Sequence, residues 1–205
     1  MTAPAGRADL TASVAGILLA AGQGSRLGQP KAQVRLGGAS LAVRGARLLG
    51  DGGAAPVIVV TGAVAVDLPG VITVHNPQWR TGMGSSLAAG LATVPDGCAA
   101  VVVALADQPL VGPAAVARLI GAFGAGATVA VAAYDGRPRN PVLLAREHWA
   151  EVTTLAAGDE GARPFLRAHP ELITAVECGD TGRPDDVDTP ADLERIAAEL
   201  DGRDR

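Results

Sequence analysis

The sequence predicts one α/β domain in which helices cover both faces of a mostly parallel central sheet. Short apolar runs rich in β-branched residues recur along the chain, and segments of small residues with helical character follow them. The run CAAVVVALA at 98–106 is almost continuously apolar, which is typical of a strand buried on both faces. A length of 205 residues without a repeat or linker fits a single domain over 1–205, and we expect flexible tails at 1–11 and 202–205.

The expected elements follow from these patterns in chain order. The strands are the apolar, β-branched runs Val14–Leu19, Pro56–Thr61, Val71–His75, Ala99–Leu105, Thr128–Ala132 and Thr174–Glu177. The helices are the segments Ser40–Leu49, Ser85–Thr93, Pro113–Phe123, Glu160–Ala168 and Pro190–Leu200. In the last of these, Thr189 is the expected N-cap and Pro190 the first helical residue.

Composition and charge disfavour several classes of protein. The net charge is −4, no basic run occurs and aromatic residues make up 2% of the chain, which argues against nucleic-acid binding. No apolar run approaches the ~20 residues that a membrane span requires. Cys98 and Cys178 lack C-x-x-C spacing and are expected to be reduced packing thiols, and the three histidines are too scattered to suggest zinc. A cytoplasmic enzyme is therefore expected.

The first glycine-rich stretch, LLAAGQGSRLGQPK, fits neither the phosphate-loop NTPase pattern nor the dinucleotide-binding fingerprint. Its glycines, Gly22, Gly24 and Gly28, let the backbone approach an anion closely, and free N–H groups there can form an anion-binding nest. Arg26 and Lys31 add two fixed positive charges, which suits a triphosphate. The alternative is an ordinary flexible loop in a glycine-rich protein.

Two aspartates are candidate metal ligands. Asp107 follows a predicted central strand, and Pro109 ends that strand so that the carboxylate projects from its tip. Asp188 immediately precedes the cap of the last helix. Carboxylates beside a phosphate loop are what Mg²⁺ binding requires. The alternatives are that Asp107 caps the next helix and that the stretch around Asp188 is only a helix start.

The stretch NPQWRTGMGSSLAAGL places a helix N-terminus at the same edge of the sheet. Gly82 and Gly84 permit a close approach, and Ser85 and Ser86 stand where N-caps belong. Trp79 fits a packing anchor and a ligand contact equally well, so it receives no role. Because aromatics are few, a nucleobase is expected to be held mainly by backbone and serine hydrogen bonds. In GDEGAR, Asp159 is either a helix cap or part of a substrate loop in which Arg163 faces an anionic acceptor.

These stretches, with LADQP and DVDTPADL, resemble in order the molybdenum cofactor cytidylyltransferase family, within the MobA-like nucleotidyltransferase superfamily. The resemblance implies a Rossmann-like domain of the nucleotide-diphospho-sugar transferase type. It implies transfer of CMP from CTP to the phosphate of molybdopterin, with release of pyrophosphate and formation of molybdopterin cytosine dinucleotide. A molybdoenzyme or its chaperone would then receive the product. The Ala-Ala-Gly at 20–22 is associated with a preference for cytidine over guanosine.

Site residues carry over from the resemblance by position. Lys31, Arg26 and Asp107 would be catalytic, and Asp107 and Asp188 would bind Mg²⁺. The nucleotide-binding set would be Leu19, Ala20, Ala21, Gly22, Gly24, Ser25, Arg26, Lys31, Gly82 and Ser86, in which Ser86 helps to read the nucleoside. The acceptor-binding set would be Asn140, Asp159 and Arg163.

The chain departs from the family pattern near the acceptor site. Many relatives have Gly-His-Pro where GRPRNPVLL places Asn140 before Pro141. Two other hypotheses therefore stay open. One is transfer from GTP or another nucleotide to a different small phosphate, such as a phospholactate or sugar phosphate. The other is a nucleotide-binding cofactor chaperone that performs no catalysis. The presence of Lys31, Asp107 and Asp188 together argues against the last, because binding alone would tolerate the loss of one.

Overall fold

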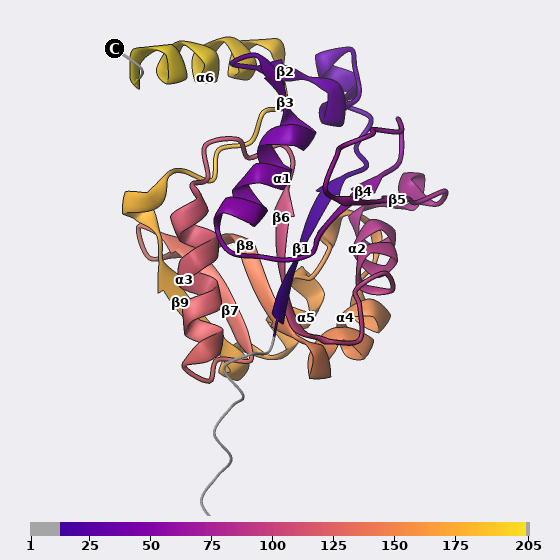
Figure 1. Cartoon of the computed structure of the whole chain (residues 1–205), viewed down its shortest axis with the longest axis vertical. Coiled ribbons are helices and arrows are strands. Elements are labelled where there is room, and N and C mark those ends of the chain that lie inside the picture. The colour runs from indigo at the N-terminus through magenta and orange to yellow at the C-terminus, as the bar shows by residue number, and fades with distance from the viewer. Residues whose placement is uncertain (1–12, 204–205) are drawn as a thin grey trace, which may run out of the picture.

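The computed structural model describes residues 13–203 and contains a seven-stranded sheet flanked by helices (Figure 1). The strand order is β5-β4-β1-β6-β8-β7-β9, and β8 is antiparallel to both of its neighbours. The strands are β1 (Ser13–Ala20), β4 (Val57–Thr61), β5 (Ile72–His75), β6 (Cys98–Leu105), β7 (Val129–Tyr134), β8 (Arg137–Ala145) and β9 (Ile173–Glu177). A short ribbon pairs β2 (Arg35–Leu36) with β3 (Ala39–Ser40). The predicted α/β class with a mostly parallel sheet is confirmed.

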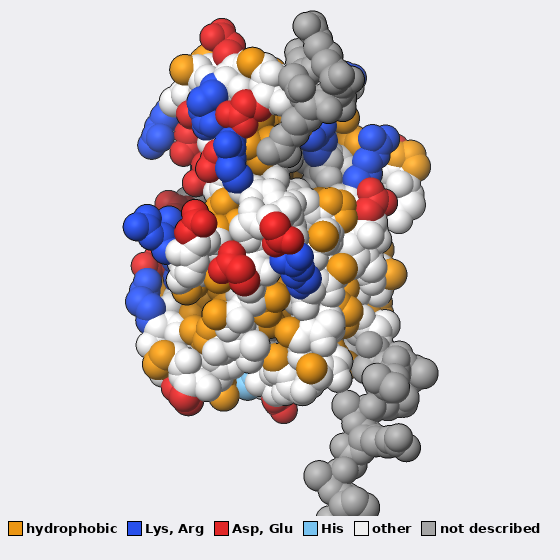
Figure 2. All heavy atoms as spheres, turned by 90° about the vertical axis from the view of Figure 1, so that its left-hand side faces the viewer, with side chains coloured by type: hydrophobic (Ala, Val, Ile, Leu, Met, Phe, Trp, Pro, Cys, Tyr) orange, Lys and Arg blue, Asp and Glu red, His pale blue; other side chains and the backbone are white. Residues whose placement is uncertain are grey.

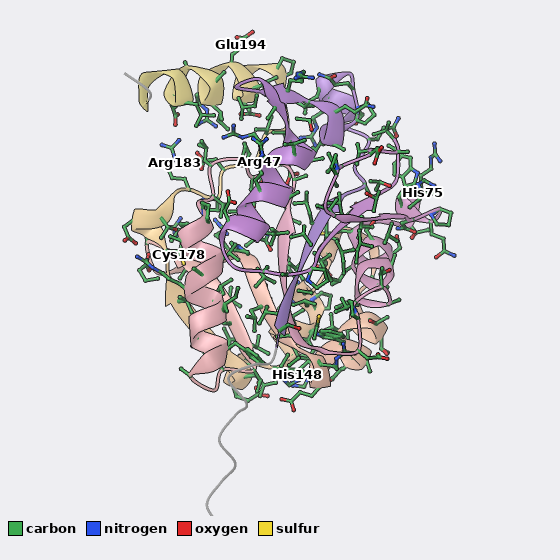
Figure 3. The ribbon with its side chains drawn as sticks, in the orientation of Figure 1. Arg47, His75, His148, Cys178, Arg183 and Glu194 are labelled. Atoms are coloured by element: carbon green, nitrogen blue, oxygen red, sulfur yellow. The ribbon has the colours of Figure 1, made fainter. Side chains whose placement is uncertain are left out.

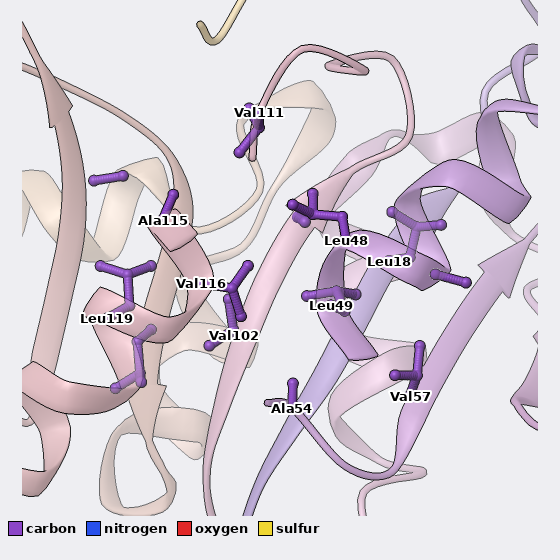
Figure 4. Packing of buried hydrophobic residues seen from close by; sticks show 14 of the residues in the cluster. Leu18, Leu48, Leu49, Ala54, Val57, Val102, Val111, Ala115, Val116 and Leu119 are labelled. Atoms are coloured by element: carbon purple, nitrogen blue, oxygen red, sulfur yellow. The ribbon is translucent and has the colours of Figure 1, made fainter. Parts of the chain in front are cut away.

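The helices cover both faces of this sheet, as the sequence predicts. They are α1 (Leu41–Asp51), α2 (Met83–Leu91), α3 (Pro113–Gly124), α4 (Trp149–Leu155), α5 (Arg163–Ala168) and α6 (Pro190–Arg203). On one face, Leu49 of α1 and Val116 of α3 pack over Leu18 of β1 and Val102 of β6 (Figure 4). On the other face, α2, α4 and α5 bury Leu87, Val152 and Phe165 against the opposite side chains of the same strands.

A third, smaller core lies beyond the carboxyl end of the sheet. It joins Val34 and Leu36 near the β2–β3 ribbon to Leu110, Val187 and Ile196 of α6. These side chains come from segments that flank the glycine-rich loop, Asp107 and Asp188. The small core therefore fixes the positions of the loops at this edge.

Some elements differ from the sequence prediction. The strand β8 was not expected, because Pro138 and Pro141 interrupt its apolar pattern. Its pairing with β7 shifts between Val131 and Ala132, which face Val142 and Arg139, so Asn140 and Pro141 form a bulge. The short helix α4 was also missed. The helix α5 begins at Arg163, three residues after the predicted start, and α6 continues to Arg203 beyond the predicted end at Leu200. The predicted tails lie mainly outside the described residues.

The surface carries mixed charge. Figure 2 shows Lys, Arg, Asp and Glu side chains interspersed on the face that forms the left-hand side of Figure 1. Arg118 of α3 pairs with Asp180 at 2.6 Å, and Arg195 pairs with Glu199 within α6 at 3.4 Å. No helix in the described residues is long and apolar enough to cross a membrane.

Candidate active site

The candidate site lies at the carboxyl edge of the sheet, where the segments after β1 and β6 meet the start of α6. Because β1, β4, β5 and β6 are parallel, the segments that follow them emerge at this one edge (Figure 1). This places the glycine-rich loop between the segments after β4 and β5 on one side and Asp107 on the other.

The glycine-rich loop folds back on itself. Gly24 and Gly28 have φ of 61° and 71°, a region that glycine adopts readily. A Cβ on Gly24 would lie 2.2 Å from the carbonyl oxygen of Gln29, so a larger residue is excluded there. The backbone N–H of Lys31 donates to the carbonyl of Gly22 at 3.3 Å, which closes the loop at its base. The two glycines therefore permit the closed turn that aims Lys31.

Lys31 joins the two candidate metal ligands. Its Nζ donates to Asp107 Oδ2 and to Asp188 Oδ1, each at 2.6 Å. Burial alone would lower the pKa of Lys31, but the charges and hydrogen bonds of Asp107 and then Asp188 outweigh it and raise the pKa above 10.5. Arg26 is more exposed, and its Nη1 lies 3.9 Å from Asp188 Oδ2. Two cations and two carboxylates thus meet at one point.

The start of α6 positions Asp188. The N–H of Asp192 donates to Thr189 Oγ1 at 3.2 Å, and the N–H of Thr189 donates to Asp192 Oδ2 at 2.9 Å, which is a capping box. The N–H of Val187 donates to the carbonyl of Asp107 at 2.8 Å and ties the two aspartates together. Thr189 and Pro190 therefore have their predicted positions. Asp107 does not cap α3, because the N-cap of that helix is Gly112.

A third carboxylate, Asp186, was not singled out from the sequence, although it stands in the same DDVD run. The amide of Gln108 donates to Asp186 Oδ1 at 3.0 Å. Burial, and then the negative charges of Asp107 and Asp188, raise the pKa of Asp186. The hydrogen bond between Gln108 and Asp186 is thus a second link between the segment after β6 and the segment before α6, beside the bond from Val187 to Asp107.

The donor set at this site fits a magnesium ion better than a softer metal. Among residues 13–203, no group of three or more His, Cys, Asp or Glu side chains is placed to hold a metal ion. Figure 3 shows His75 at the right-hand side, on the edge strand β5, and His148 at the lower end of the molecule, so these two share no site. A pair of carboxylates suits Mg²⁺, which commonly takes one or two protein carboxylates and completes its shell with phosphate oxygens and water.

The start of α2 differs from the prediction. The helix begins at Met83 with Gly82 as N-cap, so Ser85 and Ser86 lie inside the first turn and are not caps. The amide of Asn76 donates to Ser85 Oγ at 2.9 Å and to Ser86 Oγ at 3.0 Å, and Ser86 is only 2% exposed. Asn76 was missed by the sequence reasoning. The predicted nucleoside contact of Ser86 stays a prediction, and its hydroxyl already has a buried partner.

The three predicted acceptor residues lie near α5. Asn140 in the bulge of β8 and Arg163 at the start of α5 line one small cavity of about 30 Å³, whose other walls are mainly leucine and valine side chains. Asp159 lies in the 3-10 turn Gly158–Glu160. Because the N-cap of α5 is Ala162, the alternative in which Asp159 caps this helix is wrong.

A larger pocket of about 380 Å³ opens on the other side of the glycine-rich loop. Its walls are loop residues, the segment after β4 and the turn after β5: Gln23, Ser25, Gly28, Gln29, Pro30, Ala63, Trp79 and Arg80. This volume lies within the range of small-molecule sites.

Several known proteins resemble this chain in sequence or in fold. The profile of the MobA-like NTP transferase domain matches residues 16–172. Nicotine blue oxidoreductase from Paenarthrobacter nicotinovorans is 35% identical over 197 residues, which is 89% of this chain and 96% of that protein. The crystal structure of the Rv0371c homolog from Mycobacterium sp. strain JC1 has a TM-score of 0.80 at 30% identity and covers 93% of this chain and 98% of that one. Rv0371c from Mycobacterium tuberculosis H37Rv in complex with manganese has a TM-score of 0.70 at 25% identity, over 91% of this chain and 98% of that one.

Proposed function

Because the chain belongs to the MobA-like NTP transferase family, we propose that it transfers CMP from CTP to the terminal phosphate of molybdopterin. The observation that carries the proposal is the meeting of Lys31, Arg26, Asp107 and Asp188 beside a glycine-rich loop at the carboxyl edge of the sheet. Four charged groups of this kind suit the handling of a triphosphate.

The reaction requires alignment and charge stabilisation. An oxygen of the acceptor phosphate forms a bond to the α-phosphorus, and the bond from that phosphorus to the bridging oxygen breaks. Pyrophosphate leaves with the bonding electron pair. A phosphate acceptor is already ionised near neutral pH, so the protein needs no general base. Lys31 and Arg26 would stabilise the charge that grows on the leaving group.

Asp107 and Asp188 would hold Mg²⁺, and the relative Rv0371c was crystallised with manganese. A divalent cation there would offset the negative charge of the triphosphate. In the structure Lys31 neutralises the same two carboxylates. Once Asp107 and Asp188 hold a divalent cation, the ammonium group of Lys31 would become available to the phosphates.

The choice of substrates rests on other residues. Ala20, Ala21 and Gly22 favour cytidine by the resemblance described above. Asn140 and Arg163 at the small cavity, with Asp159 nearby, would contact the acceptor. Transfer from another nucleotide to a different small phosphate, and nucleotide binding without transfer by a cofactor chaperone, remain the alternatives.

A second candidate function is an oxidoreductase activity. The observation that favours it is the 35% identity to nicotine blue oxidoreductase along nearly the full length of both chains. A protein named as an oxidoreductase thus resembles this chain over nearly its whole length.

The test is release of pyrophosphate with Mg²⁺ and molybdopterin, run in parallel with CTP, GTP and ATP. We expect release with CTP, and we expect Lys31→Ala and Asp107→Ala each to lower turnover by about 10²–10³, the usual effect of losing one charge stabiliser. Circular dichroism of both variants checks that they fold. A parallel assay follows the absorbance of nicotine blue incubated with the protein and an added reductant.

Each outcome separates the candidates. Release with GTP or ATP alone would overturn the cytidine assignment. Release that needs another phosphate acceptor would overturn the molybdopterin assignment. A protein-dependent redox change of nicotine blue without pyrophosphate release from any nucleotide would favour the second candidate. Unchanged turnover in Lys31→Ala would contradict the proposed mechanism.

A further inference from the structure

The two candidate metal ligands belong to segments that a buried side chain connects. That side chain is Gln108, which is only 6% exposed and donates a hydrogen bond to Asp186. We propose that Gln108 and Asp186 are positioning residues, whose hydrogen bond sets the distance and angle between Asp107 and Asp188. The inference rests on the proposed function, because it takes these two aspartates as the ligands of a divalent cation.

The segment after β6 and the segment before α6 run side by side in opposite directions (Figure 1). The N–H of Val187 donates to the carbonyl of Asp107 at 2.8 Å. Further from the site, the N–H of Arg183 donates to the carbonyl of Leu110 at 3.1 Å. Residue numbers therefore rise along one segment while they fall along the other, and the backbone joins the two segments at both ends of this contact.

The side chain of Gln108 joins the segments between these two backbone hydrogen bonds. Its Nε2 donates to Asp186 Oδ1 at 3.0 Å and to the carbonyl of Pro184 at 3.3 Å. A buried amide needs such partners, so the two acceptors fix the conformation of the Gln108 side chain. Gln108 directly follows one candidate metal ligand, and Asp186 stands two residues before the other.

A second contact close to the ligands adds something that one backbone hydrogen bond does not supply. Two segments joined at a single point near the site can still pivot around that point. The bond from Gln108 to Asp186 provides another fixed point beside the bond from Val187 to Asp107. Mg²⁺ demands near-ideal octahedral geometry, so the angle between its two carboxylate ligands matters as well as their distance.

The neighbouring carboxylate, Asp185, is held in a different way. Its Oδ2 lies 3.2 Å from Arg183 Nη2 and 3.6 Å from Arg195 Nη1, and these side chains are 37–47% exposed. Arg183 points toward α6 in Figure 3, where it also pairs with Glu199. Exposed ion pairs of this kind contribute little to stability. Asp185 therefore offers a matched control, with the same charge in the same run of the sequence but no buried partner.

Substitutions at Asp186 separate positioning from a plain effect of charge. Asparagine keeps the length of the side chain and an oxygen that accepts from Gln108, but it carries no charge. Glutamate keeps the charge but moves the accepting oxygen outward by one methylene group. If Asp186 positions the ligands, Asp186→Asn should be tolerated better than Asp186→Glu. If its charge attracts the cation, the order should be the reverse.

The experiment measures the Kd of Mn²⁺ in the presence of CTP by electron paramagnetic resonance of the free ion, below the melting temperature of every variant. Gln108→Asn and Asp186→Glu should each raise this Kd about 10- to 100-fold, the usual effect of losing a group that orients a metal ligand. The double variant should recover most of the affinity, because a shorter amide and a longer carboxylate span the same gap. Asp185→Asn should leave the Kd unchanged.

The outcomes distinguish this inference from the proposed function. An unchanged Kd in Gln108→Asn, or a double variant as weak as the single variants, would overturn the inference, while binding of Mn²⁺ with CTP by the wild type leaves the proposed function standing. A greater loss in Asp186→Asn than in Asp186→Glu would overturn the inference in favour of the charge effect. A wild type that binds no Mn²⁺ with CTP would overturn both.

Discussion

The ammonium group of Lys31 and the carboxylates of Asp107 and Asp188 form a closed set of charges at the candidate site. The raised pKa of Lys31 means that its contribution to stability is fully present below its ordinary pKa of 10.5 and is lost as the pH rises through the higher folded value. Between pH 6 and 9 the residue therefore stays charged. Its charge is available to a triphosphate over this whole range.

A different residue gives the protein a pH-dependent contact. His169 Nε2 lies 2.8 Å from Glu151 Oε1, and His169 Nδ1 lies 3.3 Å from Glu171 Oε1. The hydrogen bond with Glu151, and to a smaller extent the one with Glu171, raise the pKa of His169 above 6.5. The stability from this contact is fully present below pH 6.5 and is lost as the pH rises through the raised value. We expect His169→Gln to lower the melting temperature more at pH 5.5 than at pH 8.5, measured by thermal unfolding of both proteins.

The partner carboxylate provides the control for this prediction. Glu151→Gln removes the nearer partner, so it should reduce the pH-dependent difference between wild type and His169→Gln. An NMR titration of the His169 ring should give a pKa above 6.5 in the wild type. An equal loss of melting temperature at both pH values would contradict the assignment.

At the scale of elements, the N-terminus of α2 depends on close packing against a neighbouring loop. A Cβ on Gly82 would lie 2.2 Å from the carbonyl carbon of Gly158, and one on Gly84 would lie 2.8 Å from the backbone of Ala156. Gly82 also has φ of 115°, which other residues rarely adopt. The glycines that the sequence suggests for approach to a ligand are thus already used to bring two segments of the protein together.

We expect Gly82→Ala to lower the free energy of unfolding by about 1–3 kcal/mol or more, because the strained φ and the contact with Gly158 add together. Urea denaturation followed by circular dichroism measures the change. Gly97→Ala is the matched control, since a Cβ there meets nothing within 4 Å, and its effect should stay within roughly 0.5 kcal/mol. Equal effects of the two substitutions would refute this account of Gly82.

At the scale of the whole molecule, α6 connects the end of the chain to the candidate site. Asp188 precedes α6, and Ile196 within α6 is fully buried in the small core with Leu36 and Leu110. Leu110 lies three residues after Asp107 in the sequence. The packing of α6 therefore sets the distance between the two candidate metal ligands.

Ile196→Ala should lower the free energy of unfolding by about 2–5 kcal/mol and also weaken binding of Mn²⁺ in the presence of CTP, because α6 loses its anchor. Leu119→Ala removes an equally buried side chain of α3, which packs in the larger core on one face of the sheet (Figure 4) and not in the small core that holds Ile196. It should destabilise the protein similarly and leave Mn²⁺ affinity unchanged. Calorimetry at a temperature below the melting temperatures of both variants measures their affinities for Mn²⁺ in the presence of CTP. An equal change of affinity in both would show that α6 does not position Asp188.

Much of this molecule follows from local patterns in the chain. The strands around Leu18 and Val102 are predicted by apolar runs, and the start of α6 by Thr189 and Pro190, since backbone propensity and capping act over a few residues. The glycine-rich loop, Asp107 and Asp188 were also recognisable, because each stands next to a strand or helix end. Lys31 was recognisable as the last residue of the glycine-rich stretch.

Only the tertiary structure decided how these residues meet. The pairing of Lys31 with Asp107 and Asp188 spans separations of 76 and 157 residues, which no local pattern encodes. The reversed strand β8 owes its place to pairing with β6 and β7 despite two prolines. The buried hydrogen bonds of Asn76 to the serines of α2, and the position of Trp79 beside the glycine-rich loop, depend in the same way on the order of strands in the sheet. Local sequence determined the elements and their functional groups, and long-range packing determined which of those groups share a site.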